Sequence, residues 1–391
     1  MTTSSRLRHR LTIAATVTAV AVVVAAAVVI PLSLSSGSAR SLPAIRPARG
    51  LHVMPFPGTL AASPQTQIIF SSVRPREIRS VSVVGSTSGP HGGRMTVLPL
   101  HRGTAFIPTT RFADGEQVTV QARLGSPAAG TALGAPNSTH IKFDFVVGAQ
   151  VNGNVGPSSA NVANTTTTTT KPPPGQTLNS VPSLHPPKVK ASGSNPDPSA
   201  GKIFVTPNNG QQVGPMILGS RGQLVWFRPL RTGQEASNLA VQRYHGKPVL
   251  TWWQGVVVAG HGVGEDVVLD QHYHTVAVVH AGEGFSTDLH EFKITPQGTA
   301  FVTSFNAVKA NLTSVGGKAQ GESVFDAVIQ EIYIPTGQVL WEWHSLGHVP
   351  ISDSYMGTPT PGQPYDYFHL NTIQQLPNGN LLITARNTWG V

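Results

Sequence analysis

The amino-acid sequence predicts an all-β protein that follows one N-terminal membrane helix. Its 391 residues include 40 glycines and 32 prolines, which suit a turn-rich sheet protein better than a helical one. Short apolar runs recur from residue 67 onward, and several alternate with the period of two that a half-buried strand requires. In the C-terminal half such runs come in pairs joined by glycine turns. Together these observations predict a small β-sandwich followed by a partial β-propeller.

The first 40 residues predict an export segment. Arg6, Arg8 and Arg10 precede an apolar stretch, 11–30. As a helix this stretch would span about 30 Å, the thickness of a bilayer core. Positive charge ahead of the span keeps the N-terminus in the cytoplasm and sends the rest outside. The length favours an uncleaved signal anchor, with a signal peptide cleaved near residues 36–39 as the alternative. Both interpretations place the protein outside the cytoplasm, membrane-anchored or secreted.

Two segments separate this helix from the C-terminal half. Residues 50–148 carry six short apolar or alternating runs, and we expect an immunoglobulin-like β-sandwich there. Residues 149–200 are rich in Thr, Pro, Ser and Asn and include an unbroken threonine run, 165–170. Such a segment cannot bury enough apolar surface to offset its ordering entropy, which predicts a linker.

Residues 201–391 predict successive propeller blades. Four tight turns are expected at Gly222, Gly298, Gly337 and Gly379, because glycine supplies the positive φ that such turns need. The expected blades are 201–230, 238–281, 288–345 and the opening of another from 366. A propeller closes with at least four blades, so we expect a chain that is truncated at its C-terminus.

Composition excludes several classes of function. The net charge of +9 divides into +12 for residues 1–200 and −3 for residues 201–391, so the excess does not mark a folded nucleic-acid surface. The absence of cysteine excludes disulfides, thiolate metal sites and cysteine nucleophiles. No GxxxxGK[ST] loop is present to hold a nucleotide, and we expect no cofactor. The oligomeric state is left open.

Histidines are the candidates for chemistry, since nine of the 15 lie between residues 245 and 369. Most lie in polar turns without a third ligand at suitable spacing, and we expect no metal site. His290 and His369 each precede the innermost strand of a predicted blade, and such positions surround one central channel. Arg386 ends the next strand, and Asn371 lies two residues past His369, on the same strand face if the alternation holds. The structural alternative is that both histidines are core residues bonded to neighbouring blades.

Longer motifs carry a resemblance to a known family. They are Pro248–Gly255, Asp288–Phe292, Thr336–Pro350, Tyr365–Asn371 and Leu382–Thr388. Taken in order, they resemble the bacterial arylsulfotransferase (arylsulfate sulfotransferase) family. The resemblance implies a six-bladed propeller that moves a sulfuryl group from a phenolic sulfate donor to a phenol acceptor. It also implies a histidine intermediate and no need for the nucleotide donor PAPS.

The resemblance assigns roles to four residues. It implies that His290, His369 and Arg386 are catalytic and that Asn371 binds substrate. These residue types suit the reaction, because fixed cationic and amide donors stabilise the charge on the sulfuryl oxygens. A neutral imidazole can attack sulfur or accept a proton near neutral pH.

One departure from the family bears on activity. The resemblance places the sulfated histidine in a later blade, whereas this chain ends five residues after Arg386. We therefore expect no sulfotransferase activity from this chain, and no residue is assigned as the nucleophile. The alternative function is that of a non-catalytic cell-surface binding or recognition protein with a propeller domain.

Overall fold

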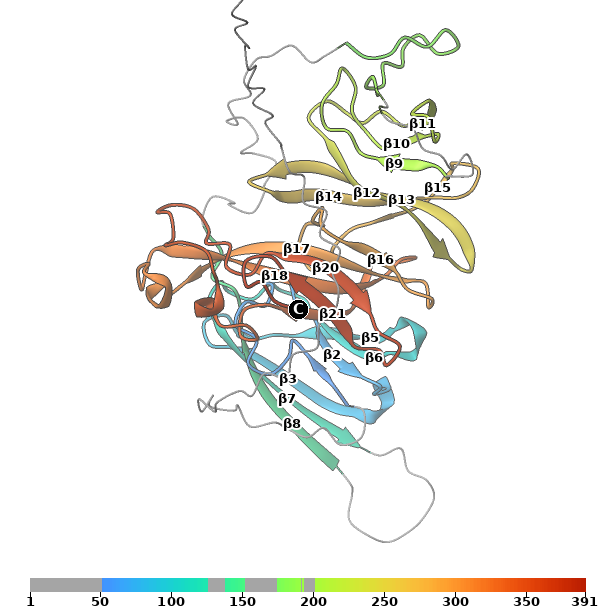
Figure 1. The fold of residues 1–391 in the computed structure, drawn as a ribbon. Helices are drawn as coiled ribbons and strands as arrows, with labels where there is room; N and C mark the ends of the chain where they lie inside the picture. The colour runs from blue at the N-terminus through green and yellow to red at the C-terminus, as the bar shows by residue number, and fades with distance from the viewer. Residues whose placement is uncertain (1–50, 126–137, 152–173, 191, 193–200) are drawn as a thin grey trace, which may run out of the picture. The chain divides into compact units, whose positions relative to one another are not determined.

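The computed structural model describes residues 51–125, 138–151, 174–190, 192 and 201–391. Across these residues the fold is all-β, built from antiparallel sheets with a few short 3-10 turns and without a closed barrel (Figure 1). The predicted signal anchor, 1–40, and the threonine run, 165–170, lie outside the described residues. Among the residues described, no helix combines the length and the apolar character needed to cross a membrane.

The N-terminal part contains two four-stranded sheets that share one core. Their strand orders are β1-β2-β6-β5 and β4-β3-β7-β8. On β7, Val118 and Val120 are buried between exposed glutamines, and they pack with Phe70 of β2 and Phe143 of β8. The predicted alternation is thus confirmed, whereas the immunoglobulin-like topology stays a prediction. The strands are β1 (Val53–Met54), β2 (Ile68–Ser71), β3 (Ile78–Gly85), β4 (Gly89–Pro90), β5 (Gly93–Leu98), β6 (Gly103–Pro108), β7 (Gln117–Gly125) and β8 (Ser138–Val146).

The C-terminal part contains four sheets that follow one another along the chain, coloured from green to red in Figure 1. Their strand orders are β11-β10-β9, β12-β13-β14-β15, β16-β17-β18-β19 and β20-β21. In each of these sheets, strands that pair are consecutive along the chain. The strands are β9 (Ile203–Val205), β10 (Met216–Leu218), β11 (Leu224–Phe227), β12 (Glu235–Tyr244), β13 (Lys247–Val258), β14 (His261–Leu269), β15 (Thr275–Val279), β16 (Phe292–Ile294), β17 (Thr299–Ala310), β18 (Glu322–Tyr333), β19 (Gln338–His344), β20 (Leu370–Gln375) and β21 (Leu381–Ala385).

The four predicted glycine turns are confirmed. Gly222, Gly298, Gly337 and Gly379 have φ values of 79°, 79°, 73° and 87°, in the left-handed region that favours glycine. Each lies between two paired antiparallel strands of one sheet. Glycine at these positions therefore sets the local hairpins along this part of the chain.

Apolar cores join each of the four sheets to the next. Ile217 of β10 packs with Trp252 of β13, and Val268 of β14 packs with Phe292 of β16. In the same way Phe305 of β17 shares a core with Leu370 of β20. Consecutive sheets therefore bury apolar surface against each other, and this packing fixes where their connecting loops meet.

Trp252 is the largest side chain in the core between the first two of these sheets, and it is fully buried. We expect Trp252→Ala to lower the free energy of unfolding by about 3–5 kcal/mol, because it leaves a large cavity. Urea unfolding followed by circular dichroism measures the change. Val241→Ala on the adjacent strand is the control, since Val241 is 60% exposed and should change stability by less than about 0.5 kcal/mol. Equal effects of the two substitutions would contradict this packing.

Candidate functional site

Three histidine rings from separate parts of the chain meet in one cluster. His261 begins β14, His290 lies in the loop before β16, and His369 directly precedes β20. The ring centroids of His290 and His369 are 4.8 Å apart, and that of His261 lies 5.2 Å from His369 and 6.3 Å from His290. The structure therefore brings together the two histidines singled out from sequence, and it adds a third, His261. We call these three residues the histidine cluster.

Two carboxylates orient these rings, the buried Asp288 and the partly buried Asp366. Asp288 Oδ2 accepts a hydrogen bond from His290 Nδ1 at 2.6 Å. Asp366 Oδ2 is hydrogen-bonded to His369 Nδ1, and it lies 3.3 Å from His261 Nε2. When Nδ1–H donates to a carboxylate, the lone pair of a neutral imidazole is at Nε2. Both His290 and His369 therefore keep Nε2 available for a reacting atom or a proton.

Asp366 is set up to remain ionised. Its burial opposes ionisation, but the hydrogen bonds and charges of His261 and His369 outweigh burial and hold the pKa of Asp366 well below its usual range. A permanently charged carboxylate can stabilise an imidazolium that forms beside it. The dyad of Asp366 and His369 is thus suited to moving a proton at Nε2.

Close packing on β14 positions the loop that carries His290. The indole N–H of Trp253 donates to the carbonyl of Thr287 at 3.0 Å, and the N–H of Gly264 donates to the same oxygen at 3.1 Å. A Cβ at Gly262 would lie 2.6 Å from the Trp253 ring and 2.7 Å from the backbone nitrogen of Leu289. Glycine is required at position 262 because the loop approaches the strand so closely.

Asn238 holds the same loop from the preceding sheet. Its side-chain amide donates to the carbonyl oxygens of Leu289 and His290, both at 2.7 Å. Its backbone is left-handed, with φ of 54°, a conformation that asparagine tolerates. Asn238 precedes Gly246 by eight residues, as His290 precedes Gly298. This matching spacing is the sequence signal by which Asn238 could have been found.

The loop that carries His369 is held by the residues that follow β21. His369 has a left-handed backbone, with φ of 52°, and its carbonyl accepts the N–H of Arg386 at 2.9 Å. The buried side-chain amide of Asn387 donates to the carbonyl of Asp366 at 2.5 Å. Arg386 therefore supports the histidine cluster through its backbone, and Asn387 is a site residue that the sequence did not single out.

The side chains of Asn371 and Arg386 are both exposed. Asn371 lies at a register shift between Leu370 and Thr372. Because of this bulge and the left-handed His369, the expected alternation does not carry from residue 369 to residue 371. Within the described chain, neither side chain makes a hydrogen bond or ion pair with the histidine cluster. Their assigned roles stay predictions.

Aromatic rings enclose the histidine cluster. The ring of His261 lies between Phe305 of β17 and Phe325 of β18, with centroids 4.2 Å and 4.4 Å away. Side-chain exposure is 2% for His261, 13% for His290 and 8% for His369. Such an environment strengthens electrostatic interactions because little water screens them.

The histidine cluster also contains a group that could hold a metal ion. Ligand atoms of His261, Asp366 and His369 all lie within 4.8 Å of one another. A hydrogen bond already joins Asp366 to His369, and His261 Nε2 lies 3.3 Å from the same oxygen, so an ion would have to displace the proton between Asp366 and His369. The arrangement is accounted for by an imidazole–carboxylate network.

A second buried group of charges lies at the end of β19. His344 Nδ1 is 2.5 Å from Asp326 Oδ2, and its Nε2 is 2.8 Å from Glu342 Oε1. Burial opposes protonation of His344, but the two carboxylates outweigh it and raise the pKa of His344 to about 10. This histidine is therefore cationic at neutral pH and serves to pair two buried acids.

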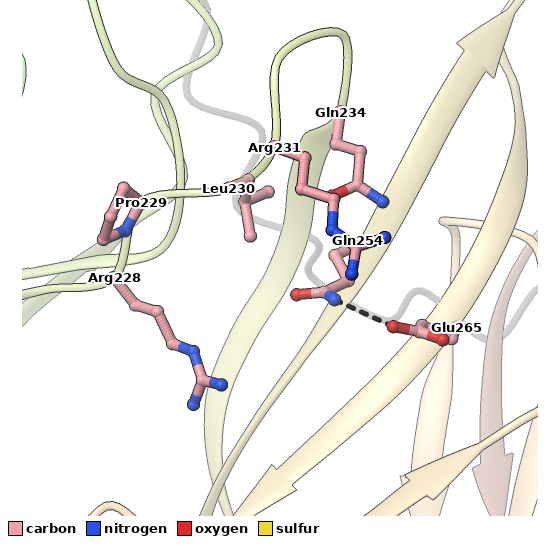
Figure 2. A pocket seen from close by; sticks show the side chains of 7 residues that line it. All are labelled: Arg228, Pro229, Leu230, Arg231, Gln234, Gln254 and Glu265. Atoms are coloured by element: carbon pink, nitrogen blue, oxygen red, sulfur yellow. Dashed lines mark hydrogen bonds between the residues drawn. The ribbon is translucent and has the colours of Figure 1, made fainter.

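Two hollows lie away from the histidine cluster. Figure 2 shows one of about 350 Å³, where Gln254 donates to Glu265 at 2.8 Å beside two arginines. It is lined by Arg228, Pro229, Leu230, Arg231, Gln234, Gln254 and Glu265. A larger one, of about 1040 Å³, lies against Trp341, Trp343 and Arg102. None of the three clustered histidines lines either hollow.

Comparison with known proteins gives one family match. Residues 240–391 match the family model described as arylsulfotransferase (ASST). This match covers the whole histidine cluster and both of its carboxylates. No curated protein matches the chain.

The solved structures that resemble this chain do so distantly. Two are structures of an uncharacterized protein from Listeria monocytogenes EGD-e, one of them in complex with α-D-glucose, β-D-glucose, magnesium and calcium. Each is 7% identical, with TM-scores of 0.16 and 0.15, over 68% of this chain. The chain spans 22% of the length of each of these proteins.

Proposed function

We propose that the protein binds an aryl sulfate and transfers its sulfuryl group to an acceptor phenol, a proposal supported by the match of residues 240–391 to the arylsulfotransferase family model. The observation that carries the proposal is the pair of Asp–His dyads. His290 and His369 keep Nε2 available, and their rings lie 4.8 Å apart within the matched segment. A sulfuryl group between them would contact both imidazoles.

The proposed reaction uses a histidine intermediate. The sequence leads us to expect an inactive chain without an assigned nucleophile, but the two Asp–His dyads supply both an attacking imidazole and a proton-moving one, and we therefore propose turnover. Nε2 of one of the two clustered imidazoles, in its neutral form, attacks sulfur, and the sulfur–oxygen bond to the donor ring breaks. The departing phenolate takes a proton from Nε2 of the other imidazole, which enters this step as an imidazolium and is left neutral. The acceptor phenol then gives its proton to that imidazole, and its oxygen attacks sulfur while the nitrogen–sulfur bond breaks. His290 and His369 serve as the attacking and proton-moving imidazoles, with Asp288 and Asp366 holding their rings. Asn371 and Arg386 are proposed to bind sulfuryl oxygens.

The proposed architecture places this site in the channel of a β-propeller. Four successive sheets, each packed on the next through an apolar core, support it. The two N-terminal sheets are proposed to be an immunoglobulin-like sandwich. The apolar stretch 11–30 supports export of the protein, either membrane-anchored or secreted. The protein would then bind donor and acceptor phenols outside the cytoplasm.

The test is acceptor-dependent release of p-nitrophenol from p-nitrophenyl sulfate, measured by absorbance with phenol as acceptor. We expect release by the full chain, and a loss of about 100-fold or more in the double variant His290→Ala/His369→Ala. His272→Ala is the control, because His272 is an exposed turn residue outside the cluster.

The outcomes separate two functions. If the wild-type chain neither binds the ester nor releases p-nitrophenol, the proposal is contradicted. Saturable binding of the ester without release would instead favour a non-catalytic recognition protein, as the alternative interpretation of the sequence holds.

A further inference from the structure

We propose that His261 is a positioning residue, which holds Asp366 so that His369 keeps its Nε2 lone pair available beside His290. The inference concerns the state of an imidazole in the unliganded protein, and its effect on catalysis rests on the proposed function. His261 does not reach the reacting atoms in this account. It acts through Asp366.

The surroundings of His261 leave it one polar partner. Its side chain is 2% exposed, and its ring lies between Phe305 and Phe325. Nδ1 of His261 is buried and has no hydrogen-bond partner within the described residues. Its Nε2 lies 3.3 Å from Asp366 Oδ2. A neutral imidazole has one N–H, and among the residues that the structure describes Asp366 is the one acceptor beside this ring, so we infer that the ring is protonated at Nε2.

Asp366 Oδ2 therefore receives two N–H groups, one from His261 and one from His369. With both bonds made, that carboxylate oxygen cannot turn away from His369. The proton of His369 stays on Nδ1, and its Nε2 remains an acceptor. Loss of the His261 bond would let Asp366 rotate, and His369 would lose its fixed tautomer.

The start of β14, which carries His261, also holds the dyad of Asp288 and His290. The backbone N–H of Gly262 donates to Asp288 Oδ1 at 2.6 Å, while Asp288 Oδ2 binds His290. Adjacent residues at the start of β14 thus bind both orienting carboxylates. The positions of His290 and His369 are therefore coupled through His261 and Gly262. A histidine that only filled the core would not couple them.

The test compares three forms of the full chain by 15N NMR of the histidine rings. Wild type should show His369 protonated at Nδ1 over the neutral range. His261→Phe fills the space between Phe305 and Phe325 without offering a donor, and we expect a mixture of His369 tautomers. His261→Gln restores an amide donor and should return part of the wild-type signal.

Each outcome decides the inference. An unchanged His369 tautomer in folded His261→Phe would overturn it, and so would a wild-type tautomer that disappears on chelator treatment, since that would mark a metal ligand instead. If His261→Phe does not fold, the failure of His261→Gln to keep the tautomer while folded would overturn it as well.

Kinetics supplies the second readout. We expect a fall of about 100-fold in kcat for His261→Phe, with little change in KM, because the dyad is misplaced while the substrate contacts remain. A tautomer change in a protein whose wild type neither binds nor transfers an aryl sulfate would support the inference and contradict only the proposed function.

Discussion

Asp366→Asn should lower sulfuryl transfer by about 1000-fold or more while leaving the fold intact. Asn has nearly the same shape, but it carries no charge to stabilise an imidazolium. Its neutral carbonyl oxygen is also a weaker acceptor than the carboxylate oxygen Oδ2 of Asp366, which both His261 and His369 now face. The initial rate of p-nitrophenol release, measured at saturating donor and acceptor, gives the change in kcat.

The chain contains a matched control for this substitution. Asp270 also lies beside a histidine, with 3.6 Å between its Oδ2 and His274 Nδ1, but that pair is exposed in a turn outside the histidine cluster. Asp270→Asn should leave the rate within about twofold of wild type, since surface pairs contribute little. Comparable losses in both variants would contradict the account of Asp366.

Asp326→Ala should lower the free energy of unfolding by about 3–5 kcal/mol near neutral pH. It leaves the buried cation of His344 with Glu342 as its remaining carboxylate partner. It also removes the acceptor for the N–H of Leu346 at 2.9 Å and the hydroxyl of Ser345 at 3.1 Å. Urea unfolding followed by tryptophan fluorescence measures the loss, and Asp353→Ala on the exposed turn at 351–353 is the control.

The same group predicts how stability depends on pH. Because folding raises the pKa of His344 from 6.5 to about 10, its contribution is fully present below pH 6.5 and is lost as pH rises through about 10. Wild-type stability should therefore fall between these values, and the fall should be smaller in Asp326→Ala. Equal slopes for the two proteins would show that His344 is not the titrating group.

Local features of the fold could be predicted from sequence because they depend on near neighbours. Period-two alternation predicts the buried face of β7, and a glycine at Gly298 or Gly379 predicts a hairpin there. The recurrence of such hairpins also predicts that the positions before successive sheets meet, as His290 and His369 do.

The remaining site residues depend on contacts between distant segments. His261 follows a hairpin turn and shows no local pattern that distinguishes it from other turn histidines. It contacts Asp366 only because β14 and the loop before β20 meet in space. The orientation of Asn371 depends on a left-handed residue and a bulge, and strand periodicity assumes that neither is present. In the sequence His344 has the pattern of an ordinary post-strand histidine, because the contact with Asp326 depends on the pairing of separate strands.

The central claim is that His290 and His369 together bind the sulfuryl group of an aryl sulfate. Titrating the full chain with p-nitrophenyl sulfate while observing the 15N signals of its histidine rings tests this most directly. The account predicts that the signals of His290 and His369 shift together and saturate at one dissociation constant, while those of the exposed His272 and His274 stay unchanged. Shifts confined to His272 and His274, or no saturating shift at all, would contradict it.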